Sequence, residues 1–301
     1  MVKRWLGVTS STVLAGIITA AAFAAPAAAA TYGQPQEWQL GLQLPASQVA
    51  HDIGSFYDLV TYIIMAITVF VLALMVYVVF RFNEKSNPTP SRTTHHALLE
   101  VAWTVVPIII LVAIAVPSFK LLNLQYAYPK ADLTIKATGY QWYWSHEYPD
   151  NGGFTFDSVM LLDDERKELI DAGIPAPRNL AVDNEVIVPV NKVVHVLVTA
   201  QDVIHAWAMP SFGTKTDAVP GRVTATWFKP TVEGVFYGQC SELCGKDHAF
   251  MPIAIRVVNE QTFNAWAEAM QASDTKKARE IIRAVAVEQA KAKQNVAAVQ
   301  N

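Results

Sequence analysis

The sequence predicts a two-helix transmembrane hairpin, followed by an all-β domain and a helical C-terminal tail. Two uncharged apolar runs, residues 59–80 and 101–119, are each close to the roughly 20 residues that cross a bilayer. Across residues 131–260, short stretches rich in Val, Ile, Thr and aromatic residues alternate with turn residues. Their spacing is typical of an antiparallel sandwich or barrel. Residues 261–301 return to a helical pattern.

The composition excludes several classes of protein. Of the 301 residues, 52% are hydrophobic and only 16% are charged, which excludes a disordered chain. The net charge of −3 gives no basic surface of the kind that binds nucleic acid. Two cysteines are too few for a disulfide scaffold. The mean hydropathy of +0.24 indicates apolar segments that a soluble core does not need.

Residues 1–30 are expected to be a cleaved signal peptide. Lys3 and Arg4 give a positive start, residues 13–23 are apolar, and residues 24–30 are small and rich in Ala. This order predicts a cut near residues 30 and 31. A retained membrane helix is the alternative, and it is disfavoured because the apolar run is short and ends in small residues rather than in a charge.

The two apolar runs predict membrane helices over residues 56–81 and 97–120, joined by a loop over residues 82–96. Basic residues outnumber acidic ones around this loop, as is typical of cytoplasmic loops. The N-terminal segment, residues 31–55, and the β domain are then expected on the outer side, where the signal would deliver them. The charges near the loop are Arg81, Lys85 and Arg92 against Glu84.

Residues 131–260 carry 17 acidic and 10 basic side chains, and the resulting charge of −7 would attract a basic soluble partner. A short helix is expected over residues 164–172. Further helices are expected over residues 263–270 and from Ser273 to about Lys293. The strands expected in the domain are residues 133–137, 141–148, 185–190, 193–199, 223–228, 234–239 and 253–258.

One short stretch carries most of the candidate chemistry. Cys240, Cys244, His248 and Met251 lie within twelve positions between two expected strands. Thiolate and thioether sulfurs are soft ligands, and the methionine favours copper over zinc. A mononuclear electron-transfer copper needs only one Cys, so the second thiolate suggests two bridged ions. A second imidazole is available upstream at His205.

A Cys240–Cys244 disulfide is the alternative interpretation of the two thiols, because the domain is expected in an oxidising compartment. A plain disulfide-bonded binding module gives no reason, however, for the histidines and the methionine around the pair.

Residues 240–245, with His248, Met251 and the upstream His205, closely resemble subunit II of haem–copper cytochrome c oxidases of the aa3 type. The aromatic run at residues 139–144 resembles the same family. The resemblance covers roughly residues 50–260. It implies a cupredoxin-like Greek-key domain that holds two copper ions in a binuclear copper A centre. The implied ligands are the bridging Cys240 and Cys244, one imidazole each from His205 and His248, the weak ligand Met251, and the backbone carbonyl of Glu242.

Further roles follow from the same resemblance. The Glu242 side chain matches a ligand of Mg²⁺ or Mn²⁺ at the boundary with subunit I. Trp142 matches the aromatic through which the electron enters, although it could equally be one of several packed aromatics. Glu100 matches the mouth of a proton path, or else it is an ordinary interfacial carboxylate. Four acidic residues match a docking surface, although each taken alone could be an ordinary solvated charge. They are Glu147, Asp157, Asp183 and Asp202.

The resemblance implies an enzyme subunit in a bacterial inner membrane, with both mature termini in the periplasm. Such a subunit takes electrons from cytochrome c and passes them to haem in subunit I, where O₂ reduction drives proton pumping. Subunit I and subunit III are the implied partners, and haem is expected only in the partner chain. The alternative is a membrane-anchored copper-delivery chaperone with a C-x₃-C site. That alternative predicts one anchor, a βαβ pattern and no Met seven residues after Cys244.

Overall fold

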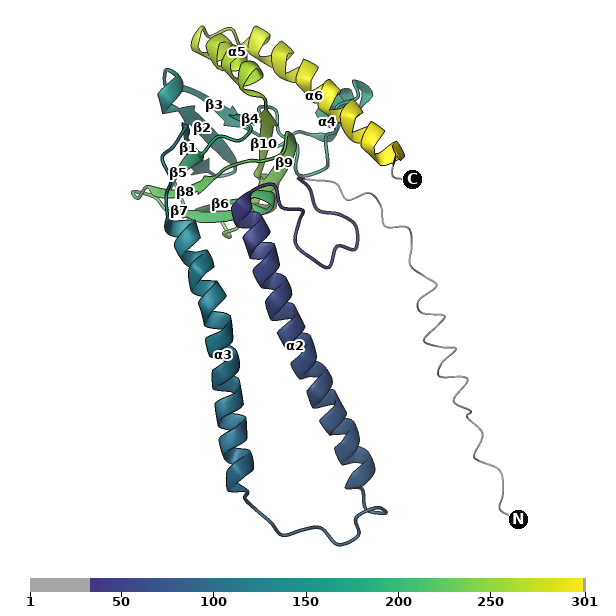
Figure 1. Cartoon of the computed structure of the whole chain (residues 1–301). Coiled ribbons are helices and arrows are strands. Elements are labelled where there is room, and N and C mark those ends of the chain that lie inside the picture. Colours follow the sequence, from purple (N-terminus) through teal and green to yellow (C-terminus); the bar gives the residue numbers. More distant parts are fainter. Residues whose placement is uncertain (1–32, 300–301) are drawn as a thin grey trace, which may run out of the picture.

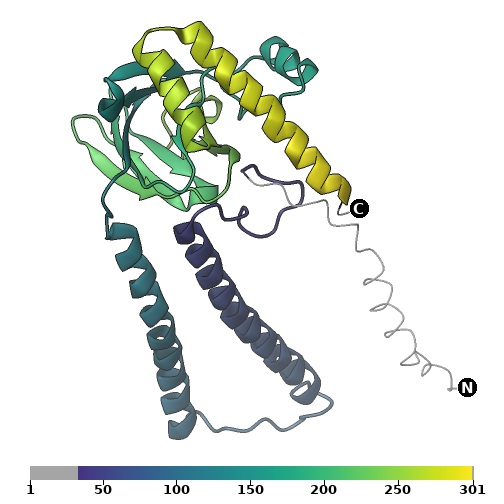
Figure 2. The ribbon, with the colours of Figure 1, turned by 45° about the horizontal axis from the view of Figure 1, so that its top comes forward.

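The computed structural model describes residues 33–299, and the expected signal peptide lies outside the described residues. Two long helices extend from one end of a β domain, and two further helices cover another side of it (Figure 1). The turned view shows α5 and α6 lying across the β domain (Figure 2). The predicted order of hairpin, β domain and helical tail is therefore confirmed.

The membrane hairpin consists of α2 (Gln48–Arg81) and α3 (Ala97–Tyr126). Apart from the first turn of α2, their side chains are not buried within the chain, so their apolar surface is left for a bilayer or for other helices. Helix α2 begins eight residues before the expected span, because Ser47 caps it. The Ser47 hydroxyl oxygen accepts a hydrogen bond from the backbone N–H of Ala50 at 3.0 Å. Helix α3 continues six residues past the expected end.

The β domain contains three sheets. The five-stranded sheet has the order β3-β2-β1-β5-β8, the three-stranded sheet has the order β4-β10-β9, and β6 pairs with β7. Strands β1 and β5 run parallel, as do β4 and β10, so the domain is mixed rather than purely antiparallel. The strands are β1 (Leu133–Tyr140), β2 (Tyr143–Tyr148), β3 (Phe154–Ser158), β4 (Val186–Pro189), β5 (Val194–Ala200), β6 (His205–Met209), β7 (Thr214–Ala218), β8 (Thr224–Phe228), β9 (Gly234–Gln239) and β10 (Pro252–Val258).

Every second side chain along β1, β2 and β5 is buried. These buried side chains form one wall of a core that the other sheets complete. Aromatic side chains fill much of it, and the rings of Phe212 and Phe228 stack at 4.5 Å. Helix α4 (Asp163–Asp171) lies in the loop region before β4. The tail forms α5 (Glu260–Gln271) and α6 (Thr275–Val299), and Trp266 of α5 packs against Tyr148 at 5.2 Å.

A buried ion pair fastens the tail to the sheet. Arg256 of β10 is 3% exposed, and its guanidinium donates two hydrogen bonds to the carboxylate of Glu185. Its third nitrogen donates to the side-chain oxygen of Gln289 in α6 at 2.9 Å. The Gln289 amide in turn donates to the backbone carbonyl of Val257 at 3.0 Å. One guanidinium therefore joins the start of β4, strand β10 and helix α6.

Replacing Glu185 with Gln should lower the free energy of unfolding by about 3–5 kcal/mol, because it leaves the Arg256 charge buried without a counter-charge. Chemical denaturation of the purified full-length chain in detergent measures the effect. The matched control is Glu280→Gln, which neutralises an exposed carboxylate on α6 and should change stability by less than about 0.5 kcal/mol. Equal stability of the two variants would show that the pair does not fasten the tail.

Candidate metal centre

The predicted metal ligands come from two segments that the fold brings side by side. His205 is the first residue of β6, whereas Cys240 directly follows β9. Gly238 and Cys240 share one face of this segment, and a Cβ atom on Gly238 would lie 1.9 Å from the carbonyl oxygen of Ala208 in β6. Only glycine permits this approach. The backbone N–H of Ser241 then donates to the carbonyl of Ala206 at 3.1 Å, which holds the loop against β6.

The loop between β9 and β10 supplies the remaining donors. Strands β9 and β10 form an antiparallel pair in which Gln239 faces Pro252, so the residues between them return to the same end of the sheet. His248 lies in a 3₁₀ turn (His248–Phe250), and Met251 immediately precedes β10. A chain reversal with two anchored ends thus gathers the loop's side chains around Cys240.

All six predicted ligand groups meet around the two sulfurs. The sulfur of Cys240 lies 3.9 Å from that of Cys244, 3.9 Å from Nδ1 of His205 and 3.3 Å from the backbone oxygen of Glu242. The sulfur of Cys244 lies 3.5 Å from Nδ1 of His248 and 3.5 Å from the sulfur of Met251. His205 and the two cysteines are buried, and their donor atoms all lie within 4.8 Å of one another.

The two cysteines are free thiols, because 3.9 Å is far longer than a disulfide bond of about 2.05 Å. Burial favours the neutral form of both thiols and acts to raise the pKa of each. For Cys240, contacts with His205 and with the backbone at Ala206 and Glu242 outweigh burial, so the net effect is a lowered pKa. For Cys244, burial and the neighbouring charge of Cys240 raise the pKa. A cation between the sulfurs would relieve this repulsion and release the second proton.

The donor set fits soft metal ions. Two sulfurs 3.9 Å apart can both contact one ion, given that a metal–thiolate bond to zinc is about 2.3 Å long. Each sulfur also has an imidazole nitrogen of its own within 4 Å. Such a set of thiolates, imidazoles and a thioether suits copper. The grouping of the ligands therefore fits the copper site that the sequence predicts.

The second nitrogen of His205 has a carboxylate partner. Nε2 of the ring lies 2.9 Å from the carboxylate of Asp202, which also accepts hydrogen bonds from the backbone N–H groups of Gln141 and Val203, both at 2.7 Å. Such a carboxylate fixes the orientation of a metal-binding imidazole. The sequence predicts Asp202 only as a docking charge, so its contact with His205 is a role that was not expected. Its position three residues before His205 is the signal that could have revealed it.

Trp142 contacts the ligand loop directly. Its indole N–H donates to the backbone carbonyl of Cys244 at 3.3 Å, and the side-chain amide of Gln141 donates to the same carbonyl at 2.8 Å. The ring is only half-buried, whereas Trp144 is fully buried and donates to the carbonyl of Met251 at 3.3 Å. Among these two indoles, Trp142 is the one that reaches from solvent to the loop.

The four acidic residues predicted at a docking surface do not share one environment. Asp157 and Asp202 both act on the hydroxyl of Tyr143, beside Trp142. Burial is the main cause that raises the pKa of that hydroxyl, and the two carboxylates raise it further. Glu147 forms a half-buried ion pair with Lys136 at 3.2 Å. Asp183 instead accepts hydrogen bonds from the backbone N–H groups of Val159 and Asn184, which stabilises a turn.

Two other predicted residues lie at the surface. The side chain of Glu242 is exposed on the ligand loop, as the metal-boundary role requires. Glu100 lies in the first turn of α3, where its carboxylate accepts a hydrogen bond from the backbone N–H of His96 at 3.2 Å. That contact gives Glu100 a local role at the start of the helix, whatever else it does.

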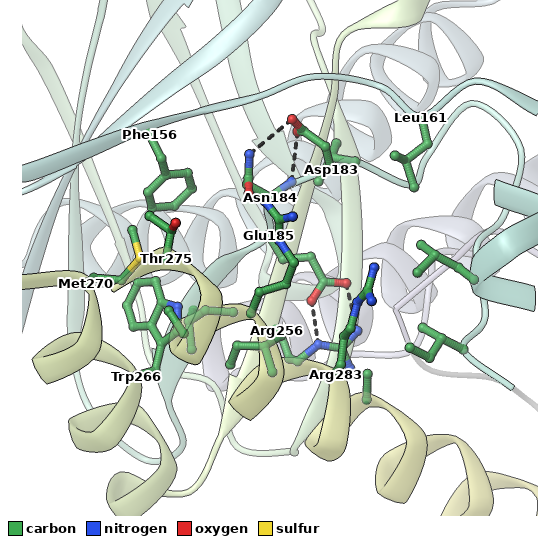
Figure 3. A pocket seen from close by; sticks show the side chains of 18 of the residues that line it. Phe156, Leu161, Asp183, Asn184, Glu185, Arg256, Trp266, Met270, Thr275 and Arg283 are labelled. Atoms are coloured by element: carbon green, nitrogen blue, oxygen red, sulfur yellow. Dashed lines mark hydrogen bonds and ion pairs between the residues drawn. The ribbon is translucent and has the colours of Figure 1, made fainter. Parts of the chain in front are cut away.

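A cavity of about 490 Å³ lies elsewhere, between the sheets and helices α4, α5 and α6. In Figure 3 the Glu185–Arg256 pair crosses its centre, Asp183 and Asn184 lie on one side, and Trp266 and Met270 lie at one end. None of the six metal-ligand residues lines it. The chemistry of the chain is therefore concentrated at the cysteine loop rather than in this cavity.

Two family models match the chain. The model described as the periplasmic domain of cytochrome c oxidase subunit II matches residues 133–258, and the model described as the transmembrane domain of the same subunit matches residues 35–121. The copper-chaperone alternative is disfavoured, because it predicts a single anchor and a βαβ unit. The described residues contain two membrane helices, and their two parallel strand pairs lie within a β domain.

Individual proteins show the same likeness. The chain is 50% identical over 233 residues to a probable cytochrome c oxidase subunit 2 of Rickettsia bellii, covering 77% of this chain and 84% of that one. It is 48% identical over 278 residues to cytochrome c oxidase subunit 2 of Cereibacter sphaeroides, covering 86% and 91%. Among solved structures, it is similar to the periplasmic domain of subunit II of the cytochrome oxidase of Bradyrhizobium japonicum, with 61% identity over 48% of this chain and 98% of that one and a TM-score of 0.44.

Replacing Gly139 with Ala should lower copper affinity about tenfold or more, because the added Cβ would lie 2.8 Å from Cδ2 of the His205 ring. Asp202 holds the adjacent Nε2 of that ring, so a shift of the ring would strain this hydrogen bond. Competition with a copper chelator measures the affinity of the full-length chain. The control is Gly41→Ala, where no atom lies within 4 Å of the new carbon. Unchanged affinity in both variants would show that the His205 position is not critical.

Proposed function

This chain belongs to the family of cytochrome c oxidase subunit II, and we propose that its β domain takes single electrons from cytochrome c at a binuclear copper centre and passes them to haem in subunit I. The convergence of four further donors, namely two imidazoles, a thioether and a backbone carbonyl, on two free thiols is the observation that carries this proposal. We propose cytochrome c as the electron donor because every copper ligand that the family resemblance implies is present in this chain. The oxygen chemistry and proton pumping would then belong to the partner chain.

In this proposal the thiolates of Cys240 and Cys244 would be shared by two copper ions, and His205 and His248 would each supply an imidazole. Met251 and the backbone carbonyl of Glu242 are the weak outer ligands. When bound, such a copper pair supplies a single redox equivalent that two ions share. The residues of this chain fill the ligand positions and leave no open one for a substrate. They also keep the ligands in place, through Asp202 on His205 and through the strand pair that closes the loop.

Trp142 is the point at which we propose that the electron enters. Its hydrogen bond to the Cys244 carbonyl joins a partly exposed ring to a ligand residue without an intervening side chain. Asp157 and Asp202 lie near the neighbouring Tyr143, so a basic protein approaching Trp142 would meet their negative charge. Glu147 and Asp183 would contribute only to the wider field, because neither of them acts on Tyr143 beside Trp142.

The proposal also assigns roles to residues at the boundary with the partner subunits and to the membrane hairpin. The exposed carboxylate of Glu242 would bind Mg²⁺ or Mn²⁺ at the boundary with subunit I, since hard cations prefer oxygen ligands. Glu100 would lie at the mouth of a proton path on the cytoplasmic side. The apolar surface of α2 and α3 would contact lipid, subunit I and subunit III in a bacterial inner membrane. Both mature termini would then lie in the periplasm.

Metal analysis and EPR of the purified full-length chain test the copper proposal. We expect two copper ions per chain and a signal from one unpaired electron shared between them. Replacing Met251 with Leu should keep both ions, because the volume is conserved, while altering the signal and slowing electron passage to haem. The control Met270→Leu lies on α5 and should leave the signal unchanged. A single-copper signal in the unmodified chain would contradict the proposal.

Replacing Trp142 with Ala should slow electron transfer from bound cytochrome c by at least about tenfold, because the indole that contacts Cys244 is lost. The expected change in binding is small. Rapid mixing of reduced cytochrome c with the assembled oxidase, at low and high salt, separates transfer from association. The control Tyr143→Ala removes the neighbouring aromatic and should transfer at the normal rate. A normal rate for Trp142→Ala would assign the role to another aromatic.

Asp157→Asn tests docking in the same experiment. It should slow association at low salt only, because screening removes long-range attraction at high salt. Asp202 is unsuitable for this purpose, since a change there also releases His205.

A further inference from the structure

The segment before α2 carries the most exposed large apolar side chains of the described residues. Trp38 is 95% exposed and Leu40 is 96% exposed, and Leu42 is half-exposed. These side chains belong to a loop, residues 35–42, which we call the N-terminal arm. In Figure 1 and Figure 2 the arm lies beside the upper end of α2 and next to the β domain. Apolar side chains that are grouped and exposed in this way are typical of an interaction surface.

Both ends of the arm are fixed to the β domain. On one side, the carbonyl of Gly33 accepts a hydrogen bond from the backbone N–H of Tyr237 in β9 at 2.7 Å. A Cβ atom on Gly33 would collide with the carbonyl oxygen of Val235, so only glycine fits there. On the other side, the hydroxyl of Ser211 donates to the side-chain oxygen of Gln43 at 3.0 Å. The chain between these two points is therefore presented in one place.

The tip of the arm holds Trp38 in a strained conformation. The backbone N–H of Gln39 donates to the carbonyl of Gln36 at 3.3 Å, which closes a turn with Trp38 at its third position. The φ of Trp38 is 58°, in the left-handed region that glycine or asparagine normally takes at this position. Packing within the chain does not offset the strain, because the indole is almost wholly exposed. Residues strained in this way are concentrated at sites where a protein binds something.

The chemistry of the arm favours a protein over a lipid as its partner. Within the part of the chain that the structure describes, the backbone N–H groups of residues 40–44 donate no hydrogen bond. Hydrocarbon would leave such groups unpaired, whereas a protein surface can pair them. Residues 33–47 contain one carboxylate, Glu37, and no basic side chain, so anionic headgroups would not attract the arm.

The height of the arm above the membrane agrees with this choice. Helix α2 begins at Gln48, and its uncharged run begins at Leu59. With a rise of about 1.5 Å per residue, the start of the helix lies about 16 Å from that run, beyond a headgroup layer of roughly 5–8 Å. The exposed apolar side chains of α2 continue below the arm (Figure 1). A membrane protein that packs against α2 and rises above the bilayer would cover both surfaces.

We propose that the N-terminal arm docks onto a membrane-embedded partner subunit of the oxidase. An apolar recess on the outer side of that subunit would receive Trp38 and Leu40, and polar groups around the recess would pair the backbone of residues 40–44. Tryptophan is among the side chains that contribute most to binding at protein interfaces. This inference rests on the proposal that the chain works together with partner subunits, and it does not depend on the copper site.

Hydrogen exchange of backbone amides tests where the arm is bound. The two samples are the assembled oxidase and the purified full-length chain in lipid nanodiscs without any other protein. The amides of residues 40–44 should exchange at least about tenfold more slowly in the assembled oxidase. The control amides, Asp163 and Asp164 in the exposed first turn of α4, should exchange equally in both samples. Equal exchange of residues 40–44 in the two samples would overturn the proposal, and strong protection in both would assign the arm to the bilayer.

Two variants test the contribution of the side chains. Trp38→Asn and Leu40→Ser should each make the chain dissociate about tenfold faster when the assembled oxidase is diluted in detergent. Asparagine tolerates the φ of Trp38, so the isolated Trp38→Asn chain should keep its stability. The matched control is Leu162→Ser, which replaces an exposed leucine just before α4 and should dissociate at the normal rate.

Dissociation of either arm variant at the rate of the control would overturn the proposal. The copper content and the EPR signal of the same samples report separately on the electron-transfer proposal. Loss of the EPR signal in the unmodified oxidase would therefore contradict that proposal and leave the result for the arm intact.

Discussion

The close approach of β9 to β6 is the constraint on which the metal centre depends. Cys240 and His205 are 35 positions apart in the chain, yet the sulfur and the imidazole lie 3.9 Å apart. The absence of a side chain at Gly238 permits this approach, and the Ser241–Ala206 backbone hydrogen bond secures it. Once Cys240 is fixed, the antiparallel return of β10 determines where Cys244, His248 and Met251 can lie. A wider gap between β6 and β9 would separate the imidazole of His205 from the pair of sulfurs.

The same hydrogen bonds that hold the ligands also join them to the outer surface. Asp202 links His205 to the backbone of Gln141, and the side chains of Gln141 and Trp142 both donate to the carbonyl of Cys244. The turn between β1 and β2, the start of β6 and the ligand loop therefore form one connected unit. A site that exchanges electrons benefits from such rigidity, because a change of charge then moves few atoms. The proposed donor surface and the ligand shell are, in this sense, one structure.

The sequence predicted what periodicity and motif can reveal. The apolar runs predicted both membrane helices, and stretches rich in Val, Ile, Thr and aromatic residues between turn residues predicted seven of the ten strands. Strands β3, β6 and β7 were missed, because none of them contains Val or Ile, and β3 and β7 are rich in polar residues. The grouping of the ligands followed from residue type, but the partner of the His205 ring did not. In the sequence, Asp202 looks like an ordinary surface carboxylate. Only its hydrogen bond to Nε2 of His205 distinguishes its role from that of Glu147.

The membrane hairpin is joined to the β domain at two separate points, and this limits how the domain can move. At the start of α2, the Ser47 hydroxyl donates to the carbonyl of Phe212, and the N–H of Ala46 donates to that of Ser211. At the end of α3, Trp227 of β8 donates to Gln125. Rotation about one helix would break the contacts at the other. The height and tilt of the domain above the bilayer are therefore set by the hairpin. This double attachment gives the copper loop a fixed position relative to any neighbour in the membrane. A fixed position matters there because electron transfer weakens steeply with distance.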